Sequence, residues 1–263
     1  MRVDGTTGDL DLADHRPDET FGWTKQRAKE DLVAEVAAVA ELQKRLFAGS
    51  DRALLVVLQA MDAGGKDGVI RNVLTGINPA GISVTSFGVP SETDLAHDYL
   101  WRIHAACPAR GHIGVFNRSH YEDVLVVRVK HLVPEERWRP RYGHINAFEA
   151  HLDAEGTTIV KLYLNVSLEE QRARLQDRID SPDERWKFRL GDLDDRALWP
   201  EYMNAYRDAM AETSTSYAPW YVVPGDRKWV RNLAVAHILR DALERIDPQY
   251  PEPEEGIEGV VVT

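Results

Sequence analysis

A short, uninterrupted apolar run at residues 53–58 (ALLVVL) constrains the fold more than any other stretch of this chain. It lacks the polar alternation of a strand that faces water on one side, so it predicts a strand buried on both faces. Such strands belong to parallel sheets that helices cover on both sides. A turn with glycines follows the run, and a helical pattern at 67–74 follows the turn.

The same alternation of strand and helix continues along the chain. Apolar runs predict further strands at 82–87, 113–116, 157–166 and 220–223. Spacings of three and four residues predict helices at 24–49, 91–106, 134–153, 167–178, 199–213 and 226–245, with Ser91 as an N-cap. The chain is therefore expected to form an α/β fold, a three-layer α/β/α sandwich around a parallel sheet. We expect an N-terminal arm at 1–23, one domain at 24–246 and an acidic tail at 247–263.

The charge balance narrows the classes of function. The formal net charge is −11, which argues against non-specific binding of nucleic acid or of a membrane surface. A polyanionic substrate would therefore need a local basic cluster. A single cysteine, Cys107, excludes an internal disulfide framework, and neither a signal peptide nor a membrane-length apolar run is recognisable. These features predict a cytoplasmic protein.

The turn after the first strand, residues 59–68 (QAMDAGGKDG), has the composition of a phosphate-binding loop. Backbone N–H groups of such a loop and the N-terminus of the next helix attract phosphate, and a lysine reaches the terminal phosphoryl groups. The expected binding residues are Ala63, Gly64, Gly65, Lys66, Asp67 and Gly68. Asp67 replaces the hydroxyl residue that usually binds Mg²⁺, so we expect Asp62 to hold the metal instead. The alternative is an ordinary turn that needs its glycines for geometry alone.

A second polar motif, residues 117–123 (NRSHYED), follows the strand at 113–116. The end of this strand is expected to face the phosphate loop, where a metal-binding aspartate is usual and Asn117 stands here. The planar guanidinium of Arg118 suits a phosphoryl group, and Glu122 is a candidate contact to the acceptor nucleotide. A structural ion pair between Arg118 and a neighbouring carboxylate is the alternative.

The segment 172–189 (RARLQDRIDSPDERWKFR) is basic in a chain that is acidic elsewhere. It predicts a mobile lid, at about 174–198, that closes on phosphates and stabilises the charge of the transition state. The candidate phosphate ligands are Arg174, Arg178, Lys187 and Arg189, with Arg178 favoured. One alternative is a solvated amphipathic helix. Another is stacking of single-stranded nucleic acid on Trp186 and Phe188.

Four segments together resemble the polyphosphate kinase 2 family: residues 59–71, 116–129, 177–188 and 213–239. The resemblance implies a fold similar to thymidylate kinase with a helical lid. It also implies Mg²⁺-dependent phosphoryl transfer between inorganic polyphosphate and nucleotides, in a homodimer or homotetramer. By the same resemblance, Asp62 is the metal-binding and acceptor-orienting carboxylate, Lys66 the phosphate-binding lysine, and Arg118 and Arg178 the phosphate-clamping arginines.

The combination of Asn117 and Glu122 resembles the subgroup that phosphorylates both AMP and ADP. The expected reaction is transfer of the terminal phosphoryl group of polyphosphate to AMP and ADP, yielding ADP and ATP, with guanine nucleotides as further candidate acceptors. Two other functions stay open at this point. One is an ATP-dependent nucleoside or nucleotide kinase on the same fold, and the other is a module that binds single-stranded nucleic acid.

Overall fold

The structure is a computed structural model that describes residues 1–3 and 10–262. Its centre is a five-stranded sheet in the order β2-β3-β1-β4-β5, in which all neighbouring strands are parallel. The strands are β1 (Ala53–Gln59), β2 (Ile82–Ser86), β3 (Ile113–Asn117), β4 (Thr157–Asn165) and β5 (Trp220–Pro224). Every residue of β1 is buried, as the apolar run predicted.

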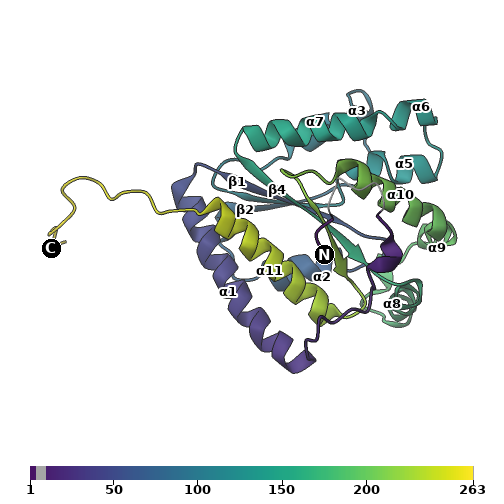
Figure 1. Ribbon diagram of the computed structural model, residues 1–263, viewed down its shortest axis with the longest axis horizontal. Helices are drawn as coiled ribbons and strands as arrows, with labels where there is room; N and C mark the ends of the chain where they lie inside the picture. Colours follow the sequence, from purple (N-terminus) through teal and green to yellow (C-terminus); the bar gives the residue numbers. More distant parts are fainter. Residues whose placement is uncertain (4–9, 263) are drawn as a thin grey trace.

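Helices cover both faces of the sheet (Figure 1). Alternate residues of each central strand point to opposite sides, so Leu54 and Val56 belong to one apolar core and Leu55 and Val57 to the other. The first core is closed by α1 (Lys25–Gly49), α2 (Lys66–Val73) and α11 (Lys228–Ile246). The second is closed by α4 (Trp101–Ala105), α5 (Val126–Val129), α6 (Glu135–Trp138), α7 (Arg141–Ala154) and α10 (Trp199–Thr213). The predicted three-layer α/β/α fold is confirmed.

Two predicted helices are each divided in the structure. The helix expected at 91–106 is α3 (Glu92–Leu95) followed by α4. Ser91 does cap α3, but the Asp98 carboxylate accepts from Leu100 N at 3.0 Å and holds a turn between the two helices. The helix expected at 134–153 is α6 followed by α7, and Pro140 stands at the division. Proline has no backbone N–H and cannot donate the hydrogen bond that would continue α6, which explains the break.

The described part of the predicted N-terminal arm lies against the domain. Val3 N donates to Trp220 O at 2.8 Å and Val222 N donates to Met1 O at 2.7 Å, so the first residues pair antiparallel with the outer edge of β5. Residues 4–9 of the arm lie outside the described residues. The acidic tail leaves the body of the molecule after α11 (Figure 1). No helix in the described ranges is long and apolar enough to cross a membrane.

A buried polar network joins the second helical layer to the sheet. The ammonium of Lys161 on β4 contacts the carboxylate of Glu149 on α7 and donates to the hydroxyl of Tyr121 at 2.8 Å. His120 contacts the same carboxylate at 3.2 Å. His120 and Tyr121 begin a 3-10 turn, η3 (His120–Asp123), two residues after the motif residue Arg118. The network therefore anchors the segment that carries the second predicted motif.

Candidate active site

The loop between β1 and α2 has the backbone geometry of a compact anion cradle. Ala63 and Gly65 both adopt positive φ, at 60° and 100°, and α2 begins immediately afterwards at Lys66. A side chain at Gly64 would collide with Ala60 and with the carbonyl of Met61, so the loop can turn this tightly only with glycine there. The first turn of α2 leaves its N–H groups without intrahelical partners, and they are available to phosphate oxygens.

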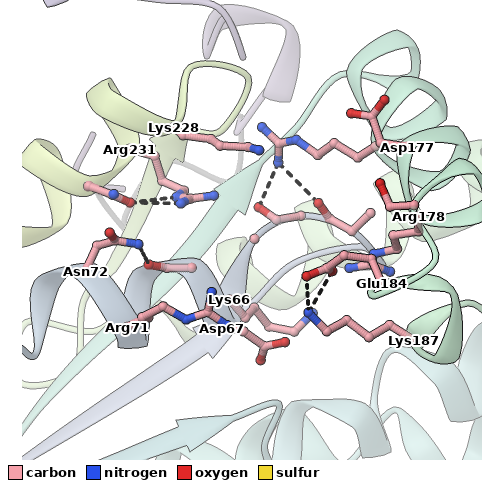
Figure 2. A pocket seen from close by; sticks show the side chains of 17 residues that line it. Lys66, Asp67, Arg71, Asn72, Asp177, Arg178, Glu184, Lys187, Lys228 and Arg231 are labelled. Atoms are coloured by element: carbon pink, nitrogen blue, oxygen red, sulfur yellow. Dashed lines mark hydrogen bonds and ion pairs between the residues drawn. The ribbon is translucent and has the colours of Figure 1, made fainter.

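A cavity of about 500 Å³ opens above this loop (Figure 2). Three parts of the chain surround it: the loop with α2, the lid, and the start of α11. The segment predicted as a lid, at about 174–198, contains the second half of α8 (Leu168–Asp180), a 3-10 turn η4 (Arg185–Lys187) and α9 (Gly191–Ala197). Seven basic side chains line the cavity against three acidic ones, Asp67, Asp177 and Glu184; the basic ones are Lys66, Arg71, Arg174, Arg178, Lys187, Lys228 and Arg231. This is the local basic cluster that an acidic chain needs to bind a polyanion.

Arg174 holds the loop instead of facing solvent. Its Nη1 donates to the carbonyls of Ala63 at 3.2 Å and Gly64 at 3.3 Å, and its Nη2 donates to the carbonyl of Gly225 at 2.6 Å. The side chain is 8% exposed and also pairs with Glu170 at 2.8 Å. Its donors are thus occupied by protein acceptors, so Arg174, a lid candidate from the sequence, fixes the shape of the loop.

Arg231 on α11 is a buried cation beside the same loop. Its guanidinium lies against the faces of Gly65 and Gly68, where any β-carbon would overlap it. The hydrogen bonds it donates within the described chain go to the neutral side chain of Asn232, at 2.8 and 3.1 Å. Burial and the nearby charge of Arg174 lower the pKa of Arg231 to about 10. The residue remains charged at neutral pH and adds to the positive potential of the cavity.

Lys66 folds back onto its own loop. Its Nζ donates to Ala60 O at 2.9 Å. Burial, together with the charge of Arg118, lowers the pKa of Lys66, while the carboxylates of Asp62, Glu122 and Asp67 act in the opposite direction. The lysine therefore stands between the cavity and a group of carboxylates.

Two of those carboxylates, Asp62 and Glu122, follow the ends of β1 and β3, whereas Asp67 lies on α2 and lines the cavity. Arg118 Nη2 donates to Asp62 Oδ1 at 2.6 Å, and Asn117 Nδ2 donates to Asp67 Oδ1 at 2.8 Å. Arg118 has a positive φ of 61°, a conformation that is uncommon outside glycine and that aims its side chain at the loop motif. Burial raises the pKa of Glu122 against the opposing charges of Arg118 and Lys66.

The structure thus divides the predicted site residues into two adjoining groups. Ala63, Gly64, Gly65, Lys66, Asp67, Gly68, Arg178 and Lys187 line the cavity. Asp62, Asn117, Arg118 and Glu122 form the second group, which meets the first through the Asn117–Asp67 contact. Arg189 does not line the cavity and is exposed.

Several cavity residues were missing from the sequence prediction. They include Arg71 on α2, Asp177 and Glu184 in the lid, and Lys228 and Arg231 on α11. Lys228 and Arg231 follow β5, and the ends of parallel strands meet at one edge of a sheet. The signal that could have revealed them was the pair of basic residues in the first turn of the helix after the last predicted strand.

A divalent cation can be tested against the donors at this site. No cluster of three His, Cys, Asp or Glu side chains with metal-binding geometry forms among the described residues. Mg²⁺, however, typically uses one or two carboxylates together with water and substrate phosphates. Asp62, with its side chain 20% exposed beside the loop, fits that role. The residues present are therefore compatible with Mg²⁺.

A parallel sheet of this strand order, a glycine–lysine loop after its central strand and a basic lid together define the fold and site of a P-loop kinase. Residues 22–251 match the family described as Polyphosphate kinase 2 (PPK2). The chain belongs to the polyphosphate kinase 2 family.

Individual relatives agree with this membership. The chain is 54% identical to an AMP/ADP-polyphosphate phosphotransferase of Meiothermus ruber, over 97% of this chain and 96% of that one. It is 45% identical to an ADP-polyphosphate phosphotransferase of Rhodopseudomonas palustris, over 89% and 85%. A crystal structure of Polyphosphate Kinase 2 from Arthrobacter aurescens superposes with a TM-score of 0.92 at 43% identity, covering 96% of this chain and 90% of that one.

Proposed function

We propose that this protein transfers the terminal phosphoryl group of inorganic polyphosphate to AMP and to ADP, making ADP and ATP. The observation that carries the proposal is the cavity over the loop, whose lining among the described residues includes seven basic residues and no aromatic one. A cavity of that kind suits a chain of phosphates better than a nucleobase. The similarity over nearly the full length to an AMP/ADP-polyphosphate phosphotransferase supports the choice of donor and acceptors.

The two groups of residues suggest a division of labour. The polyphosphate donor would lie in the cavity, with its terminal phosphoryl group at Lys66 and the N-terminus of α2. The acceptor phosphate would approach from the side of Arg118, whose planar fork matches phosphate oxygens. The lysine between the two groups then lies next to the transferred phosphoryl group.

Transfer proceeds in line. An acceptor phosphate oxygen forms a bond to the terminal phosphorus as the bond from that phosphorus to the bridging oxygen breaks, and the donor leaves one unit shorter. The acceptor oxygen is already ionised at neutral pH, so positioning and charge neutralisation supply most of the catalysis. Lys66, Arg118 and Arg178 would neutralise the equatorial oxygens. Mg²⁺, held by Asp62 and the substrate phosphates, would neutralise further charge.

Three finer points belong to the same proposal. Guanine nucleotides are candidate acceptors beside the adenine nucleotides. ATP would serve as donor in the reverse reaction, which lengthens the polyphosphate. The resemblance to the family also suggests a homodimer or homotetramer, which light scattering after size-exclusion chromatography would test.

The test is direct. Purified protein is mixed with Mg²⁺, long-chain polyphosphate and either AMP or ADP, and the nucleotides are separated by chromatography. We expect AMP to yield ADP and then ATP, ADP to yield ATP, and the Lys66→Ala protein to yield neither. ATP from ADP with no product from AMP would remove AMP from the proposal. Turnover with ATP as donor and none with polyphosphate would replace it with an ATP-dependent nucleotide kinase.

A further inference from the structure

Glu184 is an acidic side chain of the lid that faces the basic cavity. Its two carboxylate oxygens accept hydrogen bonds from Lys187 Nζ at 2.8 and 2.6 Å (Figure 2). The side chains of Glu184 and Lys187 are 47% and 23% exposed, so solvent and solutes can reach the pair. A carboxylate thus occupies the position in which a phosphoryl group would meet this lysine.

The surroundings of Glu184 are those of a bound anion. Hydrogen bonds from Lys187 lower the pKa of the carboxyl, and the charges of Arg178 and Arg71 lower it further. Glu184 is therefore ionised at neutral pH. Both arginines also line the cavity, so the carboxylate lies in the field of at least three of the cations expected to contact polyphosphate.

The other two acidic residues of the cavity lack this relationship to a lid cation. Asp67 accepts from Asn117, on the side of the second group of residues. Asp177 lines the cavity without an ion pair among the described residues. Among the described acidic residues that line the cavity, Glu184 is the one that pairs with a lid cation before any substrate arrives.

We propose that Glu184 is a specificity-determining residue: a resident carboxylate that competes with the donor for Lys187 and so favours long polyphosphate over short. An ammonium has three N–H donors, and Glu184 engages Lys187 through both of its oxygens. A phosphoryl group must displace the carboxylate or bind beside a like charge. A long chain can offset that cost through Arg71, Lys228 and Arg231 elsewhere in the cavity, whereas tripolyphosphate has fewer units with which to reach them. This inference rests on the proposed polyphosphate function.

The test compares Glu184→Gln with Asp183→Asn. Both variants remove one negative charge from the lid, but Asp183 is exposed and does not line the cavity. Binding of tripolyphosphate and of long-chain polyphosphate is measured by titration calorimetry, and KM is measured with each donor. Because an exposed ion pair contributes only modestly, Glu184→Gln should lower the Kd and KM for tripolyphosphate about two- to fivefold. The Kd and KM of Glu184→Gln for long-chain polyphosphate should change less than about 1.5-fold. Asp183→Asn should have the same Kd and KM as the unaltered protein with both donors.

Other results would overturn the inference. Weaker binding by Glu184→Gln would mean that the carboxylate holds Lys187 in place for the donor. If the affinity for tripolyphosphate rose equally in Glu184→Gln and Asp183→Asn, the effect would come from the total charge of the protein alone. If Glu184→Gln bound short and long polyphosphate more tightly by the same factor, Glu184 would have no role in selecting chain length. The failure of the proposed function is distinguishable, because the unaltered protein would then bind and use neither donor, and this inference would fall with it.

Discussion

Arg118 Nη2 lies 2.6 Å from Asp62 Oδ1, and this contact joins the phosphate loop to the end of the neighbouring strand β3. The ion pair brings the arginine that would bind the acceptor to the carboxylate that would hold the metal. It also keeps both charges compensated before substrate arrives. When substrate binds, Arg118 would contact the acceptor phosphate and Asp62 would contact the metal, in place of each other. Loss of either residue should therefore impair the function of both.

Replacing Asp62 by asparagine should therefore remove activity and leave the fold intact. The change keeps the size of the side chain but removes the charge for Mg²⁺ and for Arg118, so we expect kcat to fall about 100-fold or more. Turnover of ADP to ATP with polyphosphate measures the loss, and circular dichroism checks the fold. Asp31→Asn, on α1 with a side chain that is 37% exposed, is the matched control and should retain full activity. Full activity of Asp62→Asn would refute the role given to this carboxylate.

Arg174 should stabilise the loop through its shape as well as its charge. Lysine cannot reproduce the bonds to the carbonyls of Ala63, Gly64 and Gly225, so Arg174→Lys leaves buried acceptors unsatisfied. We expect the free energy of unfolding to fall by about 1–3 kcal/mol, together with a rise in the KM for polyphosphate. Urea unfolding measures the first effect. Arg172→Lys, on the exposed side of the same helix, should leave both quantities unchanged. Equal free energies of unfolding for Arg174→Lys and Arg172→Lys would contradict the role of Arg174 in holding the loop.

Gly65 should not tolerate even a methyl group. Its φ is 100°, and a β-carbon there would overlap the guanidinium of Arg231. Gly65→Ala should displace the loop and lower kcat/KM about 100-fold, because misplacement by about 1 Å is enough for such a loss. Gly143→Ala, exposed in the first turn of α7 with open space around it, should instead raise the free energy of unfolding by about 0.5–1 kcal/mol. Retention of activity by Gly65→Ala would mean that the loop adapts.

The buried pair of Lys161 and Glu149 should be costly to break on one side. Lys161→Met leaves the carboxylate without its counter-ion in the core, and we expect the free energy of unfolding to fall by about 3–5 kcal/mol. The double variant Lys161→Met/Glu149→Leu should be more stable than the single one, because no buried charge then remains unpaired. Arg139→Met, which breaks the exposed pair with Glu135, should cost less than about 1 kcal/mol. A double variant less stable than the single one would contradict this reading.

Cys107 should be nearly unreactive in the folded protein. Burial raises the pKa of its thiol to about 12, from an ordinary value of 9.0. Because the reactive species is the thiolate, alkylation by iodoacetamide at pH 8 should be about a thousandfold slower in the folded than in the unfolded chain. The rate should rise about tenfold per pH unit between pH 8 and 11. Mass spectrometry after timed quenching measures the rate, and equal rates in the folded and urea-unfolded chain would contradict the burial.

A site residue can be predicted from the sequence when the residues that define its role are close to it in the chain. The loop at 59–68 could be predicted because its glycines, its lysine and the strand before it are adjacent in the chain. Arg174 and Arg178 lie four residues apart and share a helix face, so the sequence could not separate the buried clamp from the cavity cation. That difference depends on the carbonyl of Gly225, which comes from a distant loop. Lys228 and Arg231 were missed for the same reason, since strand β5 must pair with β4 before α11 can approach the loop.

The two edges of the sheet have unequal consequences for self-association. The antiparallel pairing of Met1–Val3 covers the β5 edge, whereas nothing in the part of the chain that the structure describes pairs with the outer edge of β2. A sheet with two open edges can add copies without limit and grow into fibres. A sheet with one open edge can join one further copy, antiparallel about a two-fold axis, and both open edges are then used. Strand-mediated association of this protein is therefore expected at the β2 edge, because the first three residues leave only a very short strand at the other edge.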